Sequence, residues 1–185
     1  MMAQQATMYH LKVALSDVDR GVYEALDLRL ARHPSETARY MFTRALAYCL
    51  CFEEGIAFSK GGLSSADDPA LSVKDLQGTT TTWIEIGAPS ADRLHKANKA
   101  TGRVVVFSSS ELVHLRKEWS TKAIHQAERI EVYLLAPAFL DALEDATDRN
   151  SSWDLTRTDG TLYVTTKGGS VIEGTVTKAT VTPTA

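Results

Sequence analysis

The sequence predicts one α/β domain over residues 1–185, with a mixed sheet flanked by helices, an N-terminal hairpin and short C-terminal strands. Three observations predict this class. Apolar residues alternate near the N-terminus, strand and helix patterns alternate up to about residue 148, and residues 104–107 form a continuous apolar run. A chain of 185 residues usually builds one hydrophobic core, and no linker divides this one.

The first two strands are predicted by strict alternation of large apolar residues over 9–15 and 26–30. The segment SDVDRG between them contains Ser, Asp and Gly, which accept turn conformations. We therefore expect an antiparallel hairpin.

The segment TARYMFTRALAYCLCFEEG is apolar at nearly helical spacing and predicts a buried helix. Ser35 is the predicted N-cap, and Gly55 is placed to end the helix. Cys49 and Cys51 lie two positions apart, so their side chains point about 200° apart around the helix axis. We expect two reduced, buried thiols that neither bridge each other nor share a metal ion.

The remaining chain alternates strands and helices. Residues 56–107 predict strands, a turn at Gly78 and one helix; the apolar run that ends this segment is typical of a strand buried on both faces in a largely parallel sheet. An amphipathic helix over SSELVHLRKEWSTKAIHQA, a strand in IEVYLLA and a helix beginning at Pro137 follow. The last strands join at Asp159-Gly160 and Gly168-Gly169, both favoured hairpin dipeptides.

Charge and composition restrict the function. A net charge of -3 gives no global attraction to phosphates, so nucleic-acid binding requires a local basic patch. No stretch reaches the roughly 20 apolar residues of a membrane span, and the start of the chain lacks the pattern of a signal peptide. We expect a cytoplasmic protein without a membrane partner. Glycine-rich phosphate loops, G-x-S-x-G and H-E-x-x-H are absent from the sequence, which argues against nucleotide-cofactor enzymes, serine hydrolases and zinc proteases.

Three segments resemble the YaeQ family of small bacterial proteins: SDVDRGVY, LARHPSETARYMFTRALAY and FSKGGLSSADDPALSVKDLQGTTTTWIEIGAPSADRLHKA. They span about residues 6–107, and HPSET, FSKG and WIEIG together make the resemblance specific. The resemblance implies a restriction-endonuclease-like α/β fold related to the PD-(D/E)XK nuclease superfamily, with a rearranged version of its motif.

In that superfamily, acids on neighbouring strands share a Mg²⁺ ion that activates water, and a lysine stabilises the anionic transition state. By this resemblance Glu85 is a catalytic acid and a metal ligand. It follows Ala70 by fifteen positions, a spacing that suits a strand hairpin. An ionised side chain on a central strand is also costly unless it is paired or binds a metal. We expect Glu85 to point into a cleft edged by residues 61–69.

The chain departs from the pattern at Ala70, where the superfamily has its usual Asp. The second carboxylate is then expected from Asp68, from Asp67 or, less favourably, from Asp75. Asp68 is the catalytic choice, and both Asp67 and Asp68 are assigned to the metal, although acids in such a polar loop also form turns and caps.

A second departure is Gly87, which stands where the pattern has its lysine. Lys96 and Lys99 on the following helix are the nearest replacements, because a four-carbon side chain reaches the same point from another backbone position. Lys96 is preferred as the catalytic cation and Lys99 as a substrate-binding residue. Lys60 is predicted either to bind phosphate or to pair with the acids of the neighbouring loop.

Glu36 has two interpretations. Helix-borne glutamates that precede the core strands often complete the metal site in the superfamily, which makes Glu36 a further metal or supporting residue. An acid in the first turn of a helix is also favoured by the helix dipole alone.

Two hypotheses for function remain. One is a Mg²⁺-dependent phosphodiesterase acting on DNA or RNA, with Asp68, Glu85 and Lys96 at its centre. The other is a non-catalytic regulatory protein that retains the nuclease-like fold and binds nucleic acid or a protein partner. Because acids gathered in one site repel each other until a cation arrives, the metal hypothesis predicts that Glu85→Gln leaves the stability of the apo protein unchanged or higher.

Overall fold

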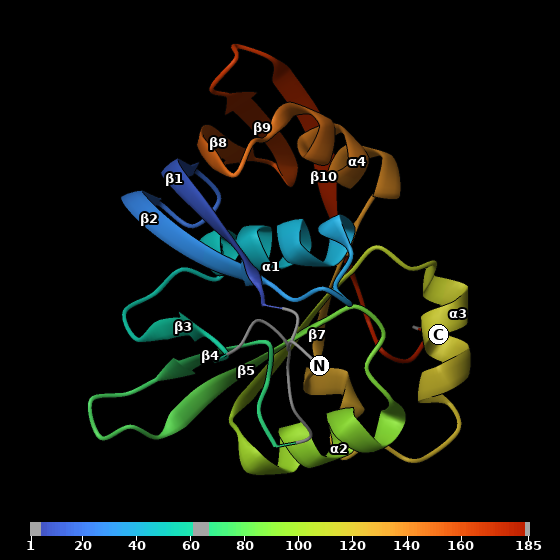
Figure 1. The fold of residues 1–185 in the computed structure, drawn as a ribbon. Helices are drawn as coiled ribbons and strands as arrows, with labels where there is room; N and C mark the ends of the chain where they lie inside the picture. Colours follow the sequence, from blue (N-terminus) through green and yellow to red (C-terminus); the bar gives the residue numbers. More distant parts are fainter. Residues whose placement is uncertain (1–4, 61–66, 184–185) are drawn as a thin grey trace.

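One curved sheet organises the computed structural model, which describes residues 5–60 and 67–183 (Figure 1). The strands of this part of the chain are β1 (Thr7–Asp17), β2 (Val22–Arg32), β3 (Ile56–Phe58), β4 (Leu71–Lys74), β5 (Thr80–Ile86), β6 (Arg103–Ser108), β7 (Glu131–Leu135), β8 (Asn150–Thr158), β9 (Thr161–Thr166) and β10 (Val171–Ala179). The helices are α1 (Ala38–Leu50), α2 (Ala91–Ala100), α3 (Leu112–Trp119) and α4 (Pro137–Ala146), with a short 3₁₀ helix, η1 (Ala127–Arg129).

The strand order is β2-β1-β8-β9-β10-β7-β6-β5-β4-β3. Among these strands, parallel pairing is found only between β1 and β8, between β5 and β6, and between β6 and β7. The predicted mixed sheet is therefore confirmed, and the largely parallel arrangement expected around residues 104–107 does not extend to its outer parts, which hairpins build. It holds locally for β6, whose neighbours β5 and β7 are both parallel to it.

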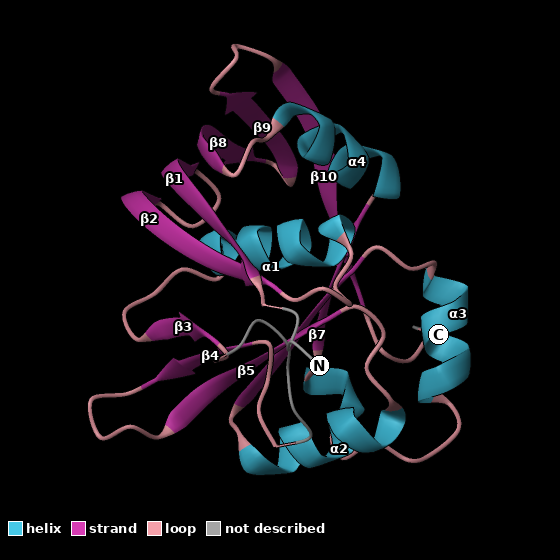
Figure 2. Ribbon diagram, viewed as in Figure 1, coloured by secondary structure: helices cyan, strands magenta, loops and turns pink. Residues whose placement is uncertain are grey.

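The helices lie on both faces of the sheet, as expected (Figure 2). The main core packs α1 and α4 against the inner face of the curved sheet. A second cluster packs α2 and α3 against the opposite face of β6 and β7. Along β6, Val105 and Phe107 belong to the first cluster, and Val104 and Val106 to the second. This alternation explains the continuous apolar run.

The predicted N-terminal hairpin is confirmed: β1 and β2 pair antiparallel over their full length. The predicted ends of α1 are wrong. Its N-cap is Thr37, whose side chain accepts a hydrogen bond from the Tyr40 amide, and it ends at Leu50 with Cys51 as C-cap. Gly55 instead lies in the turn before β3, with a φ of 94°. Both cysteines are free and buried, as predicted.

Hydrogen bonds from Arg20 connect the hairpin tip to the end of α1. Asp17 is fully buried and pairs with Arg20 at 2.7 Å. Arg20 also donates hydrogen bonds to the carbonyls of Cys49 and Phe52, both at 3.1 Å. Arg20 therefore fixes the hairpin tip against the chain segment in which α1 ends.

The amphipathic helix predicted over residues 109–127 is shorter, because α3 ends at Trp119. The Trp119 indole nitrogen donates to the carbonyl of Pro89 at 2.9 Å, and the hydroxyls of Ser120 and Thr121 bond to backbone carbonyls one turn earlier. The C-terminal strands are confirmed, with positive φ values at Asp159, Gly160 and Gly169 in their turns.

Candidate functional site: a buried glutamate held by an arginine

Glu85 lies on β5, between β4 and β6, and is only 2% exposed. Trp83 stands two positions earlier on the same face of the strand, and its indole nitrogen donates to Glu85 Oε1 at 2.6 Å. Arg93, from α2, donates from Nε to the same oxygen at 2.6 Å. A carboxylate on a central strand is thus paired, as its burial requires.

Arg93 joins three parts of the fold. Besides Glu85, its guanidinium lies 5.7 Å from the centre of the Trp83 ring and donates to the backbone carbonyl of Asp68 at 2.7 Å. Arg93 thereby connects α2, β5 and the segment preceding β4. Burial raises the pKa of Glu85, and the hydrogen bonds from Trp83 and Arg93 and the charge of Arg93 oppose that rise.

Glu36 repeats this arrangement at the start of α1. It is 5% exposed, and its Oε1 accepts from Arg44 Nε at 2.8 Å, while Oε2 accepts from the His33 amide at 3.0 Å. Burial raises the pKa of Glu36, and Arg44 opposes the rise. Since Glu36 precedes the N-cap Thr37, it lies outside the first helical turn, and the prediction that placed it there is wrong.

Arg44 is itself 1% exposed and connects two edges of the sheet. It donates to the carbonyl of Ala31 on β2 at 3.0 Å, and its guanidinium lies 5.7 Å from the centre of the Phe58 ring on β3. Glu36 and Arg44 are therefore a pair within the core, between the edge strands.

A polar hollow of about 480 Å³ lies beside β3, β4 and β5. Its lining includes the two acids and the lysine predicted from the sequence, two further polar strand residues and two aromatic rings: Asp67, Asp68, Lys60, Lys74, Ser72, Trp83 and Phe58. Glu85 does not line it, so the expectation that Glu85 points into a cleft is wrong: the side chain is buried beside the Trp83 indole. Residues 61–66 of the predicted cleft edge lie outside the described residues.

Lys96 and Lys99 are exposed on α2, and no hydrogen bond or ion pair between either residue and Glu85 is found in the described structure. Arg93, one turn before Lys96, contacts Glu85 instead. Asp75 accepts hydrogen bonds from the amides of Gln77 and Thr79, which gives it a turn-forming role between β4 and β5.

Within the described residues, no second carboxylate joins Glu85 or Glu36 in a cluster of metal ligands. Magnesium needs hard oxygen ligands in near-octahedral geometry, usually with more than one water. In residues 5–60 and 67–183, no group of three or more Asp, Glu, His or Cys side chains is placed to hold a metal ion. Glu85 and Glu36 each bind a guanidinium, which would repel a divalent cation on the same carboxylate.

Sequence reasoning missed the two arginines that hold these acids. Arg93 follows Glu85 by eight positions, and Arg44 follows Glu36 by eight. Buried acids require partners, so the available sequence signal was the need for a cation near each predicted acid. Their pairing depends on how helix and strand pack, which spacing alone does not define.

Comparison with known proteins gives a consistent result. The family model described as YaeQ protein matches residues 2–174. The YaeQ protein of Salmonella typhi is 30% identical over 88% of this chain and 90% of its own length. The YaeQ crystal structure from Pseudomonas syringae superposes with a TM-score of 0.84 at 33% identity, covering 96% of this chain and 98% of that one. The YaeQ structure from Xanthomonas axonopodis pv. citri gives a TM-score of 0.85 at 28% identity, covering 95% and 98%.

No helix in the described part of the chain combines the length and apolar character that a membrane crossing demands. The match to the family model and the similarity to its solved structures extend the resemblance in the first 107 residues to nearly the whole chain. The chain belongs to the YaeQ protein family.

Proposed function

We propose that this chain is a non-catalytic nucleic-acid-binding protein, a divergent relative of the PD-(D/E)XK nuclease fold. The observation that carries the proposal is the ion pair between Glu85 and Arg93. In the nuclease pattern the acid on this strand binds a metal ion; here a guanidinium from α2 occupies that carboxylate.

The charge balance of this pair favours binding over cleavage. A bound arginine neutralises Glu85 without a metal ion, and it cannot activate a water molecule as a nucleophile. Any Mg²⁺ at this carboxylate would lie beside the cation that contacts it at 2.6 Å. The repulsion between the two cations opposes metal binding. The Mg²⁺-dependent phosphodiesterase therefore has less support from this geometry.

The polar hollow beside β3–β5 supports single-stranded nucleic acid as the ligand. Trp83 and Phe58 offer rings on which bases can stack, and Lys60 and Lys74 offer charges for phosphates. Asp67 and Asp68 lie in the same hollow and reduce its net attraction. We expect weak binding with a marked dependence on salt concentration.

Tryptophan fluorescence tests this proposal directly. Of the three tryptophans, Trp119 and Trp153 are buried at 3% and 1% exposure, so a change on titration with an oligonucleotide reports Trp83. We expect quenching by single-stranded DNA or RNA at low salt. Replacement of both Lys60 and Lys74 by Ala should weaken affinity about tenfold, while Lys12→Ala, an exposed lysine on β1, should leave it unchanged. Absence of quenching at low salt would reject nucleic acid as the ligand of this hollow.

Calorimetric titration with Mn²⁺ tests the competing phosphodiesterase hypothesis. We expect no stoichiometric Mn²⁺ binding to the wild-type protein. If the wild-type protein binds Mn²⁺ and Glu85→Gln does not, the metal-site hypothesis is supported instead. Cleavage of an oligonucleotide in the presence of Mn²⁺ would then establish enzyme activity.

A further inference from the structure

We infer that β2 is a dimerisation strand, which pairs antiparallel with β2 of a second copy of this chain in a register centred on Leu28. β2 is the first strand in the sheet order, and no described strand pairs with its outer side. It has 11 residues, whereas β3 at the opposite edge has three. Natural sheets usually keep edge strands short or cover them, because an exposed edge is a template for another strand.

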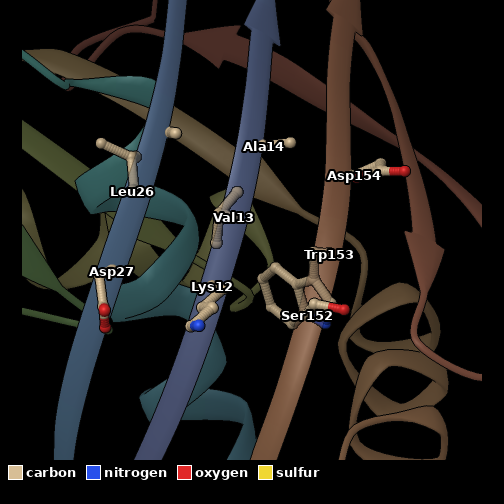
Figure 3. A pocket seen from close by; sticks show the side chains of 9 residues that line it. Lys12, Val13, Ala14, Leu26, Asp27, Ser152, Trp153 and Asp154 are labelled. Atoms are coloured by element: carbon tan, nitrogen blue, oxygen red, sulfur yellow. The ribbon is translucent and has the colours of Figure 1, made fainter.

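The two faces of β2 differ in character. Leu26, Leu28 and Leu30 are buried on the inner face, which packs against α1. Asp27 and Arg29 are exposed on the outer face, as are Lys12 and Ala14 on the neighbouring strand β1. Figure 3 shows this outer face, with Asp27 on β2 beside Lys12 on β1. A pairing strand must therefore place its leucines inward and its charges outward.

Charge complementarity selects the register. Centred on Leu28, an antiparallel pair of β2 strands places Asp27 opposite Arg29 of the second copy, and two-fold symmetry repeats this contact. Opposite charges at directly facing positions stabilise a strand pair. Centring the pair on Asp27 or on Arg29 would bring like charges together on the two-fold axis.

Other registers fail for related reasons. A register shifted by one residue would place a leucine of one β2 strand directly opposite a charged residue of the other, because leucines and exposed residues alternate along the strand. A pair centred on Leu26 would set Arg29 opposite Tyr23 and Asp27 opposite Ala25, and one centred on Leu30 would set Arg29 opposite Ala31. Only the Leu28 register joins Asp27 to Arg29.

Intramolecular contacts limit the paired span. Arg44 holds the Ala31 carbonyl at 3.0 Å, so the backbone pairing is confined to Leu26–Leu30. Asp27 pairs with His10 on β1 within the same chain, but its side chain remains 57% exposed and accessible to a second cation. Arg29 is also exposed. The two charges that define the register are thus free to meet a partner strand.

A charge exchange across the proposed interface is the sharpest test. Sedimentation velocity of the wild-type chain over a concentration series should show a species of twice the 20.2 kDa chain mass. Asp27→Arg should raise the dimer dissociation constant at least tenfold, because the introduced guanidinium would face that of Arg29. Adding Arg29→Asp should restore the dimer, because the charges are then exchanged. Lys99→Ala, an exposed lysine on α2 away from β2, is the control that should leave dimerisation unchanged.

Melting curves will show whether each variant is folded. If Asp27→Arg fails to fold, hydrogen exchange of the wild-type protein replaces it: the amides of residues 26–30 should exchange more slowly at high than at low protein concentration. A wild-type chain that stays monomeric overturns the proposal. So does a dimer that Asp27→Arg leaves intact, a charge exchange that fails to restore a lost dimer, or exchange in residues 26–30 that is independent of concentration.

Discussion

Glu85 and Glu36 are each buried and each held by one arginine from a helix. A buried carboxylate costs free energy unless a charged partner and hydrogen bonds compensate, and removal of one partner leaves the other uncompensated. The stability contributed by each acid therefore depends on its arginine, and that of the arginine on the acid. This changes the consequence of a mutation at Glu85.

Glu85→Gln should lower the free energy of unfolding by about 2 kcal/mol, because the amide replaces one carboxyl oxygen by an N–H donor and leaves fewer acceptors beside the donors of Arg93 and Trp83. This replaces the expectation, based on a metal site, of no loss. Urea denaturation provides the measurement. The double variant Glu85→Met with Arg93→Met is the control, and it should cost less than the sum of its single changes, since no unpaired charge remains. Additive losses would show that the two side chains do not act as a pair.

Stability should depend on pH through the same two acids. Burial raises the pKa of Glu85 and of Glu36 above their ordinary value of 4.5, so the folded protein binds these protons at higher pH than the unfolded chain. Their stabilising contribution is complete below pH 4.5 and is lost as pH rises through the folded pKa. Relative to Glu85→Gln, the wild-type protein should gain unfolding free energy as pH falls from 7 to 5. A constant difference between the two proteins over this interval would contradict the raised pKa.

The thiols of Cys49 and Cys51 should not react in the folded protein. Burial raises the pKa of each to about 12, and thiolates are the reactive form. A colorimetric thiol reagent should detect no rapid reaction in native buffer and two thiols in denaturant. Two fast groups in the native state would mean that the C-terminal end of α1 opens readily.

At the scale of elements, residue periodicity predicted the hairpin, β6, α2 and the C-terminal strands. It did not predict where α1 and α3 begin or end, because local side-chain bonds decide these positions. Ser35, the expected N-cap, hydrogen-bonds instead with His33 at 2.7 Å, and Thr37 caps the helix. At α3, Ser120 and Thr121 turn their hydroxyls to backbone carbonyls and compete with a further helical turn.

The sequence predicted only part of the candidate site, because contacts between elements decide the rest. The sequence identified Glu85 because a charged residue on a central strand needs a partner. It also identified Lys60 and the acids that share the polar hollow with it. The partner itself, Arg93, comes from the packing of α2 across β5, which no spacing rule describes. A lysine was expected from the nuclease pattern, and Lys96 was preferred because the stretch Arg93 to Ala97 falls within the family resemblance.

Gly55→Ala should destabilise the protein strongly, by more than about 3 kcal/mol, because a strained backbone and a steric clash combine. Gly55 has a φ of 94°, and an added Cβ would lie 2.1 Å from the Lys74 carbonyl oxygen. Gly78→Ala is the matched control: its φ is 83°, but no atom lies within 4 Å of the added carbon. It should cost only about 1 kcal/mol, from backbone strain alone. Thermal melts of both variants measure the difference, and equal losses would show that the contact with Lys74 contributes nothing.

At the scale of the whole molecule, the sheet joins chain segments that are distant in sequence. β1 lies between β2, which follows it directly, and β8, with which it pairs in parallel. The tip of the N-terminal hairpin also meets the turn between β8 and β9, where Asp19 accepts hydrogen bonds from the amides of Asp159 and Gly160. The sheet is therefore complete only when both ends of the chain are present.

This interleaving has a consequence for how the protein is made in the cell. The amide of Asp159 is 140 positions from its acceptor Asp19, and translation at about 5–20 residues per second separates their synthesis by roughly 7–28 seconds. During that interval β1 and β2 have been synthesised, but β8 has not. The edge of β1 that pairs with β8 in the complete protein therefore has no partner strand yet. Because an unpaired strand edge is a template for other strands, a fragment that ends before β8 should aggregate more readily than the whole chain.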